Sequence, residues 1–160
     1  MRTAVILMLA APALAALPAQ AAAPAVSWSY IAETRELIGS TGEDEGDTDF
    51  RATCKAGGKA ELGIGAVDGI GSGGGEAVSV TLANADGTLT VHIAGVSKHS
   101  LNSEMTGGVE LVAAADKTHA VFTLLAAPGP IKVSGPLTTQ WPATGRAAAT
   151  KAFMKACFGG

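Results

Sequence analysis

Apolar and polar side chains alternate along much of this chain. In the range 49–55, Phe50, Ala52 and Cys54 fall on one side, and charged or hydroxyl-bearing residues fall on the other. A period of two is typical of a β-strand with one buried face, so we predict a strand here with Cys54 toward the core. Similar patterns predict a strand that begins at Ser27 and further strands at 60–67, 76–83, 88–94, 109–114, 119–126 and 131–134.

The range 119–126 differs from the other predicted strands because both of its faces are apolar. Phe122 and Leu124 on one side are opposed by Val121 and Leu125 on the other. This pattern favours a central strand that is covered on both faces.

The period changes near the C-terminus. Ala149, Phe153 and Cys157 recur every fourth residue, which predicts an amphipathic helix at about 144–158. Its opposite side is expected to carry the polar residues Arg146, Thr150, Lys151 and Lys155. The fold class predicted from both patterns is mainly β, an antiparallel β-sandwich of about seven or eight strands with one C-terminal α-helix.

The first residues have the layout of a signal peptide. Arg2 precedes an apolar stretch from Ala4 to Leu17, and small residues follow at the positions where a signal peptidase would cut. We predict a removed segment 1–23, with cleavage after Ala21 or Ala23. A membrane anchor is the alternative, but the apolar stretch is short and contains a proline.

The remaining range, 24–160, has the size expected of a single domain with one core. Without Arg2 it contains ten Lys and Arg against fourteen Asp and Glu, a net charge of −4. This weakly negative balance gives no reason to expect nucleic acid as a partner. No membrane span is expected after cleavage.

Cys54 and Cys157 are the only two cysteines. An even count in an exported chain favours a disulfide, which would tie the terminal helix to the strand that carries Phe50. A thiol-exchange enzyme is the alternative, but such enzymes usually place their cysteines close together in sequence. A disulfide also requires an oxidising compartment, so we expect a periplasmic or secreted protein.

The most polar segment of the chain is the acidic range 43–49. Asp44, Asp47 and Asp49 could supply oxygen ligands to calcium, which takes six to eight of them. The spacing of an EF-hand is absent, and a solvated loop is the alternative interpretation. No other metal site is predicted, because His92, His99 and His119 form no ligand-like pair and belong to different predicted segments.

Two further segments contain residue types that occur in catalytic or phosphate sites. The glycine cluster at 69–75 lacks the Lys-Ser or Lys-Thr and the helix that follow a phosphate-binding loop. Ser97-Lys98-His99-Ser100 combines a nucleophile with an imidazole, but the partners of a catalytic triad are rarely sequence neighbours. We predict no catalytic residue, and a small hydrolase remains an alternative.

An early Trp28, a strand with Phe50-x-x-x-Cys54 and a terminal helix with Phe153-x-x-x-Cys157 form a recurring arrangement. In these features the chain resembles small uncharacterised exported proteins of proteobacteria. The resemblance implies the fold and the disulfide, and it carries over no ligand or catalytic residue.

The function that these observations favour is that of an exported, non-catalytic accessory or binding module of the bacterial envelope. Its expected partner is another envelope protein or a small ligand. The alternatives are a calcium-dependent module that uses the 43–49 loop and a small hydrolase.

Overall fold

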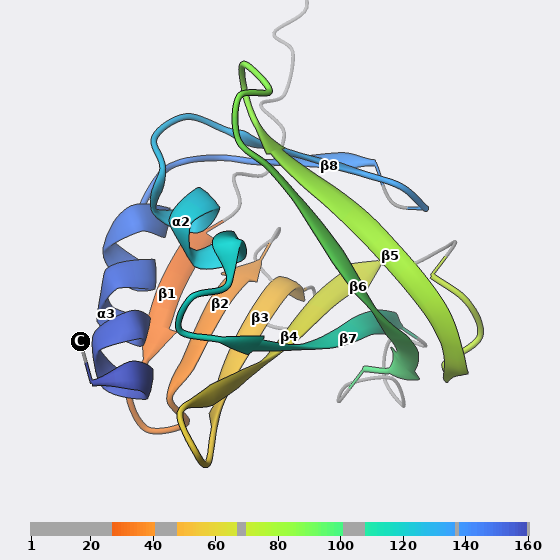
Figure 1. Ribbon diagram of the computed structural model, residues 1–160, viewed down its shortest axis with the longest axis horizontal. Coiled ribbons are helices and arrows are strands. Elements are labelled where there is room, and N and C mark those ends of the chain that lie inside the picture. Colours follow the sequence, from red (N-terminus) through yellow and green to blue (C-terminus); the bar gives the residue numbers. More distant parts are fainter. Residues whose placement is uncertain (1–26, 41–47, 67–69, 101–107, 137, 160) are drawn as a thin grey trace, which may run out of the picture.

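The computed structural model describes residues 27–40, 48–66, 70–100, 108–136 and 138–159, which are mainly β-structure (Figure 1). These residues form nine strands and two helices. The strands are β1 (Ser27–Ile31), β2 (Glu36–Ser40), β3 (Thr48–Lys55), β4 (Lys59–Ala66), β5 (Gly74–Asn84), β6 (Thr90–His99), β7 (Val109–Asp116), β8 (Ile131–Ser134) and β9 (Thr139–Trp141). The helices are α2 (Ala120–Ala126) and α3 (Arg146–Phe158).

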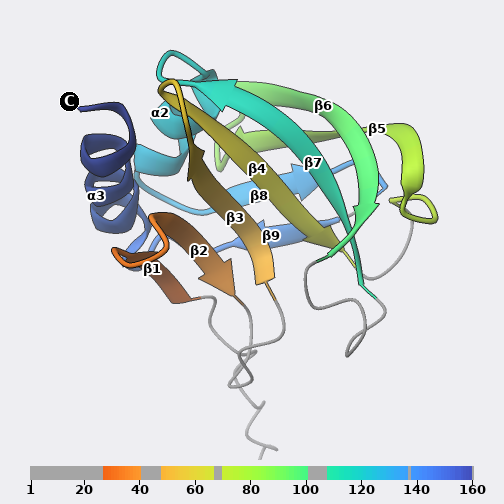
Figure 2. The ribbon, with the colours of Figure 1, turned by 90° about the horizontal axis from the view of Figure 1, so that it is seen from below.

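All nine strands belong to one sheet, in the order β1-β2-β3-β4-β7-β6-β5-β8-β9. Every pairing in it is antiparallel. The sheet curls into a half-barrel, so that its two halves face each other across the core (Figure 2). The mainly β, antiparallel fold with a C-terminal helix is therefore confirmed, and one continuous sheet supplies both layers.

Alternation along the strands places apolar side chains inside the curled sheet. In β4, for example, Leu62 and Ile64 are fully buried, whereas Glu61 lies on the outer face. The large side chains Phe50 and Trp141 are fully buried in the same core. The inner face is thus filled with packed side chains, and the outer face of the sheet is the accessible one.

Helix α3 packs beside β1 and β2 and against α2 (Figure 1). Its residues Ala149, Phe153 and Cys157 face the core, as their spacing predicts. The predicted disulfide between Cys54 and Cys157 is confirmed, with the two Cα atoms 5.4 Å apart. It joins the end of β3 to the last turn of α3.

The prediction of a strand at 119–126 is wrong, because residues 120–126 form helix α2 and His119 caps it. The buried residues Val121, Phe122, Leu124 and Leu125 line one side of that helix. A short apolar run fits either structure by periodicity alone. His119 favours the helix, because its Nδ1 accepts a hydrogen bond from the amide of Val121 at the N-terminus.

The prediction that Arg146 and Thr150 lie on the polar side of α3 is also wrong. Both side chains are fully buried. The Thr150 hydroxyl donates to the Arg146 carbonyl oxygen across 2.8 Å, and the Arg146 guanidinium is surrounded by carbonyl oxygens near the end of α2. Because α3 packs on α2, a second side of α3 is buried. The spacing of apolar residues along α3 does not indicate this second buried side.

Strands β2 and β9 were not predicted. Both are short, and β2 contains Gly39, which lies beneath the Trp28 ring. Neither described helix has the length and apolarity needed to cross a membrane.

Candidate functional site

The acidic range proposed as a calcium site lies mostly outside the described residues, as do Asp44 and Asp47. Asp49 lies near the start of β3. Within the described parts of the chain, no three His, Cys, Asp or Glu side chains gather closely enough to hold a metal ion. The calcium hypothesis therefore stays a prediction.

The glycine cluster folds around the carboxylate of Glu76. The amides of Ser72 and Gly74 donate to this carboxylate across 3.2 and 2.9 Å, and the Ser72 hydroxyl donates to it as well. These hydrogen bonds lower the pKa of Glu76 to about 2. A carboxylate of the chain itself is thus the acceptor for these loop amides.

The segment that begins at Ser97 helps to hold this glycine loop in place. Ser97 is fully buried, and its Oγ accepts a hydrogen bond from the Gly73 amide across 2.9 Å. The His99 ring lies against Gly73, where an added Cβ would be only 2.9 Å away. Ser72 bonds directly to Glu76, whereas a triad places an imidazole between hydroxyl and carboxylate. The residues do not support the hydrolase hypothesis, which stays untested.

The other two histidines lie in different parts of the fold. His92, on β6, has its Nδ1 3.3 Å from the Thr81 hydroxyl oxygen. His119 caps α2. Each imidazole thus has a local structural contact.

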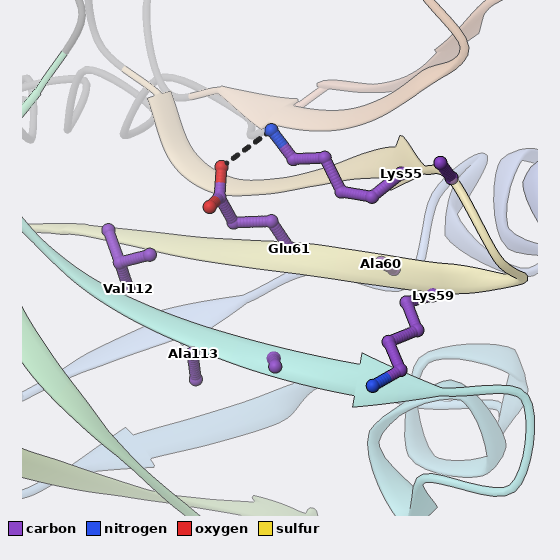
Figure 3. Close-up of a pocket in the computed structure, with 8 residues that line it drawn as sticks. Lys55, Lys59, Ala60, Glu61, Val112 and Ala113 are labelled. Carbon is purple, nitrogen blue, oxygen red and sulfur yellow. Dashed lines mark ion pairs between the residues drawn. The ribbon is translucent and has the colours of Figure 1, made fainter.

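A depression of about 300 Å³ opens on the outer face of the sheet, across β4 and β7 (Figure 3). Val112 and Ala114 of β7 supply apolar surface. On one side Lys55 Nζ lies 2.9 Å from Glu61 Oε1, and Lys59 stands on another side, where it forms no ion pair with a described residue. The complete lining is Lys55, Ala56, Lys59, Ala60, Glu61, Val112, Ala113 and Ala114.

The apolar surface continues beyond the depression along one cross-strand row. Val112 of β7 is opposite Val96 of β6, and Val96 is opposite Ala77 of β5. Gly63 of β4, which is opposite Val112, is buried. We call Val112, Val96 and Ala77 the outer row. Val96 is the exposed large apolar side chain among the described residues, at 36% exposure. The depression and the outer row together form a surface of small apolar groups with charges beside it.

Arg51 and Glu110 form an ion pair beside this surface. Arg51 Nη2 lies 2.7 Å from Glu110 Oε1, and the side chains are only 16% and 10% exposed. Burial raises the pKa of Glu110, while the charge of Arg51 acts in the opposite direction. The pair crosses Gly63, where a Cβ would lie 2.5 Å from Glu110 Oε2, so glycine leaves the space that the carboxylate occupies.

None of the residues on this outer surface was predicted as a site. The polar face of 49–55 is visible in the sequence, but nothing in the sequence pairs β4 with β7. Two signals were available in the sequence. Gly63 interrupts an alternating strand, and Glu110 is the one charged residue near the start of the otherwise apolar strand β7.

No protein-family model, curated protein or solved structure matches this chain. The interpretation of its function therefore depends on the geometry described above.

Proposed function

We propose that the protein is an exported, non-catalytic binding module of the bacterial envelope. It docks a partner protein through the depression and the outer row. The observation that carries this proposal is the outer surface of β4, β7 and β6, where exposed apolar groups lie beside a depression with a charged rim. Protein interfaces commonly combine an apolar centre with a polar rim in this way.

The charges of the rim favour a partner segment with carboxylate groups. Glu61 is already paired with Lys55, whereas Lys59 is exposed and forms no ion pair with a described residue. Lys117 lies in the turn after β7, next to Asp116, the residue opposite Lys59, whose carboxylate accepts hydrogen bonds from the amide and the hydroxyl of Thr118. A partner carboxylate could pair with Lys59 while small apolar side chains of the same partner cover Val112 and Ala114.

Export to the periplasm or the medium is part of the proposal. The Cys54–Cys157 bridge supports it, since disulfides persist in oxidising compartments. The signal-peptide pattern of 1–23 supports it from the sequence. Cell fractionation of a C-terminally tagged chain, with mass spectrometry of its N-terminus, tests both the compartment and the cleavage after Ala21 or Ala23.

The docking surface is tested by affinity purification of the tagged protein from its own cells after chemical crosslinking. Ala114→Arg places a bulky cation in the depression, and Lys59→Glu reverses the charge proposed to meet the partner. Ala148→Arg, at an exposed position of α3, is the matched control. The proposal expects one partner that is captured by the wild type and the control and lost in both surface variants. Equal capture by all four proteins, or no specific capture by the wild type, contradicts it.

The two alternative functions, a calcium-dependent module and a small hydrolase, are tested separately. A melting temperature that is the same with calcium and with a chelator would dispose of the calcium-dependent module, since a ligand of the folded state raises stability. Failure of an active-site-directed serine probe to label the protein would remove the small hydrolase.

A further inference from the structure

Strand β5 has a strand beside it along only part of one side. On its other side β6 pairs with it over 74–83, whereas β8 pairs with it over 81–84 alone (Figure 1). The chain leaves β5 at Gly135, which follows β8 and has a φ of 133°, a value that favours glycine. The range 77–80 therefore has no strand next to it on the β8 side among the described residues. We call the β8 side of 77–80 the open edge.

The main-chain N–H and C=O groups of Ala77 and Ser79 point to the open edge. Successive residues of an antiparallel strand direct these groups to opposite sides. The Asn84 amide donates to the chain that leads into β6, and the Thr81 carbonyl oxygen accepts from the Ser134 hydroxyl on β8. Because the bulge of β5 lies before residue 77, the alternation is regular from there on. Odd-numbered residues of 77–83 thus face the β8 side.

The open edge lacks the features that usually protect a free strand edge. Natural proteins guard such edges with charged side chains or proline. The range consists of Ala77, Val78, Ser79 and Val80, so it has neither. Ala77 is exposed, and Val78 and Ser79 are partly exposed. The carboxylate of the neighbouring Glu76 accepts hydrogen bonds from the glycine loop. An uncharged edge of this kind is a template for pairing with another chain.

The open edge is continuous with the docking surface on the outer face. Ala77 belongs to the outer row, where it lies opposite Val96. A strand added at the open edge would place one side chain beside Ala77 and the next beside Val78, which packs on the core but stays partly exposed. Both neighbours are small and uncharged. The side chains that suit these positions are therefore small apolar or β-branched ones.

The position of β8 limits what can occupy the open edge. Ser134, opposite Thr81, lies on the same side of β5 directly after the open edge. A second copy of this chain would bring its own β5, which is eleven residues long, and that strand would run into β8. A short extended segment fits between the bulge and β8. The geometry thus favours a segment of another protein over a second copy.

We propose that the partner protein donates a short extended segment, which binds the open edge as an additional antiparallel or parallel strand. Carbonyl oxygens of the segment accept hydrogen bonds from the N–H groups of Ala77 and Ser79, and an N–H of the segment donates to the Ala77 carbonyl oxygen. Main-chain hydrogen bonds hold the segment in this mode of binding, and alternate side chains select it. The inference rests on the proposed docking function and specifies how the partner is bound.

Proline substitutions test the strand pairing, because proline removes an N–H and is tolerated where that N–H faces away from a neighbouring strand. Ala77→Pro and Ser79→Pro each remove one donor of the open edge. Ala77→Val is the matched control, since it changes the side chain and keeps the N–H. The tagged full chains are purified from their own cells after crosslinking, alongside Ala114→Arg. We expect capture of one partner by the wild type and by Ala77→Val, and roughly tenfold less by each proline variant.

The other outcomes separate the two proposals. Full capture by both proline variants, together with loss in Ala114→Arg, would overturn strand addition and leave the docking surface in place. Capture of nothing but a differently tagged second copy would overturn the choice of occupant. If the wild type captures no partner, both proposals fail.

Amide hydrogen exchange of the wild type tests the same pairing without a substitution, in case a proline variant does not fold. In the protein alone, the amides of Ala77 and Ser79 should exchange faster than those of Val78 and Val80, which face β6. In the complex with the captured partner, exchange at Ala77 and Ser79 should slow by at least about tenfold. Unchanged exchange at both amides in that complex would overturn the proposal.

Discussion

The Arg146 Nε donates a hydrogen bond to the carbonyl oxygen of Leu125 across 3.0 Å. This contact joins the first residue of α3 to the last turn of α2. The four other guanidinium hydrogen bonds end on carbonyl oxygens of the chain that follows α2 and of the chain that precedes α3. A single buried side chain thus satisfies main-chain acceptors of two segments and fixes the two helices relative to each other.

Replacing this side chain should destabilise the fold. Arg146→Met leaves several buried carbonyl oxygens without a donor, and we expect a loss of at least about 3 kcal/mol in the free energy of unfolding. Arg146→Lys should restore only part of it, because an ammonium has three donors and a guanidinium has five. Denaturant unfolding measures both changes. Lys151→Met, at an exposed position of the same helix, should change stability by less than about 0.5 kcal/mol, and an equal loss in both Met variants would count against this role.

The disulfide should contribute strongly to stability because it closes a long loop. Cys54 and Cys157 are separated by 103 residues, and removal of a native disulfide typically costs about 2–5 kcal/mol. We expect the unfolding midpoint of the wild type to fall on addition of a reducing agent. The Cys54→Ala/Cys157→Ala double variant should already have the lower midpoint and should not respond to reduction. A wild-type midpoint that is unaffected by complete reduction, verified by thiol counting, would contradict the prediction.

Gly63 should be required by the ion pair that crosses it. The Cβ of Gly63→Ala would meet Glu110 Oε2 at 2.5 Å, so we expect a loss of about 1–3 kcal/mol through overpacking and displacement of the carboxylate from Arg51. In the Glu110→Ala background the same substitution has no carboxylate to meet and should cost much less. The coupling between the two changes should be about 0.5–3 kcal/mol in a double-mutant cycle. Additive effects would show that Gly63 and Glu110 act independently.

Glu76 should make stability depend on acid pH. Hydrogen bonds from the Ser72 side chain and from backbone amides lower the pKa of Glu76 from 4.5 to about 2 in the folded protein, so folding favours the carboxylate form. Its contribution should be fully present above about pH 4.5 and lost as the pH falls toward about 2. The difference in unfolding free energy between wild type and Glu76→Gln should shrink over this interval. A Glu76 carboxyl that titrates in NMR near its ordinary value would contradict the described loop geometry.

The period-two pattern was sufficient to predict most of the sheet, because a strand such as β3 has one apolar and one polar face. It failed at 120–126, where a short run that is apolar on both faces fits a strand and a helix equally well. Arg146 shows a second limit. Its hydrophilic character predicts exposure, whereas the carbonyl oxygens that surround it come from segments whose proximity depends on tertiary packing.

The candidate sites were harder to predict than the fold. Cys54 and Cys157 could be paired because the chain offers no other cysteine. The docking surface depends on the adjacency of β4 and β7, which lie far apart in sequence and are brought together by the strand order. Asp44 and Asp47, the residues singled out for calcium, lie outside the described part of the chain.

The most direct test of the docking surface is site-specific photocrosslinking in living cells. A photoreactive amino acid replaces Val96, on the outer row, or Thr123, at an exposed position of α2 on another part of the molecule. The proposed function predicts a discrete adduct with one partner protein from position 96 and none from position 123. No adduct from position 96, or the same adducts from both positions, would contradict the assignment of the outer face as the binding surface.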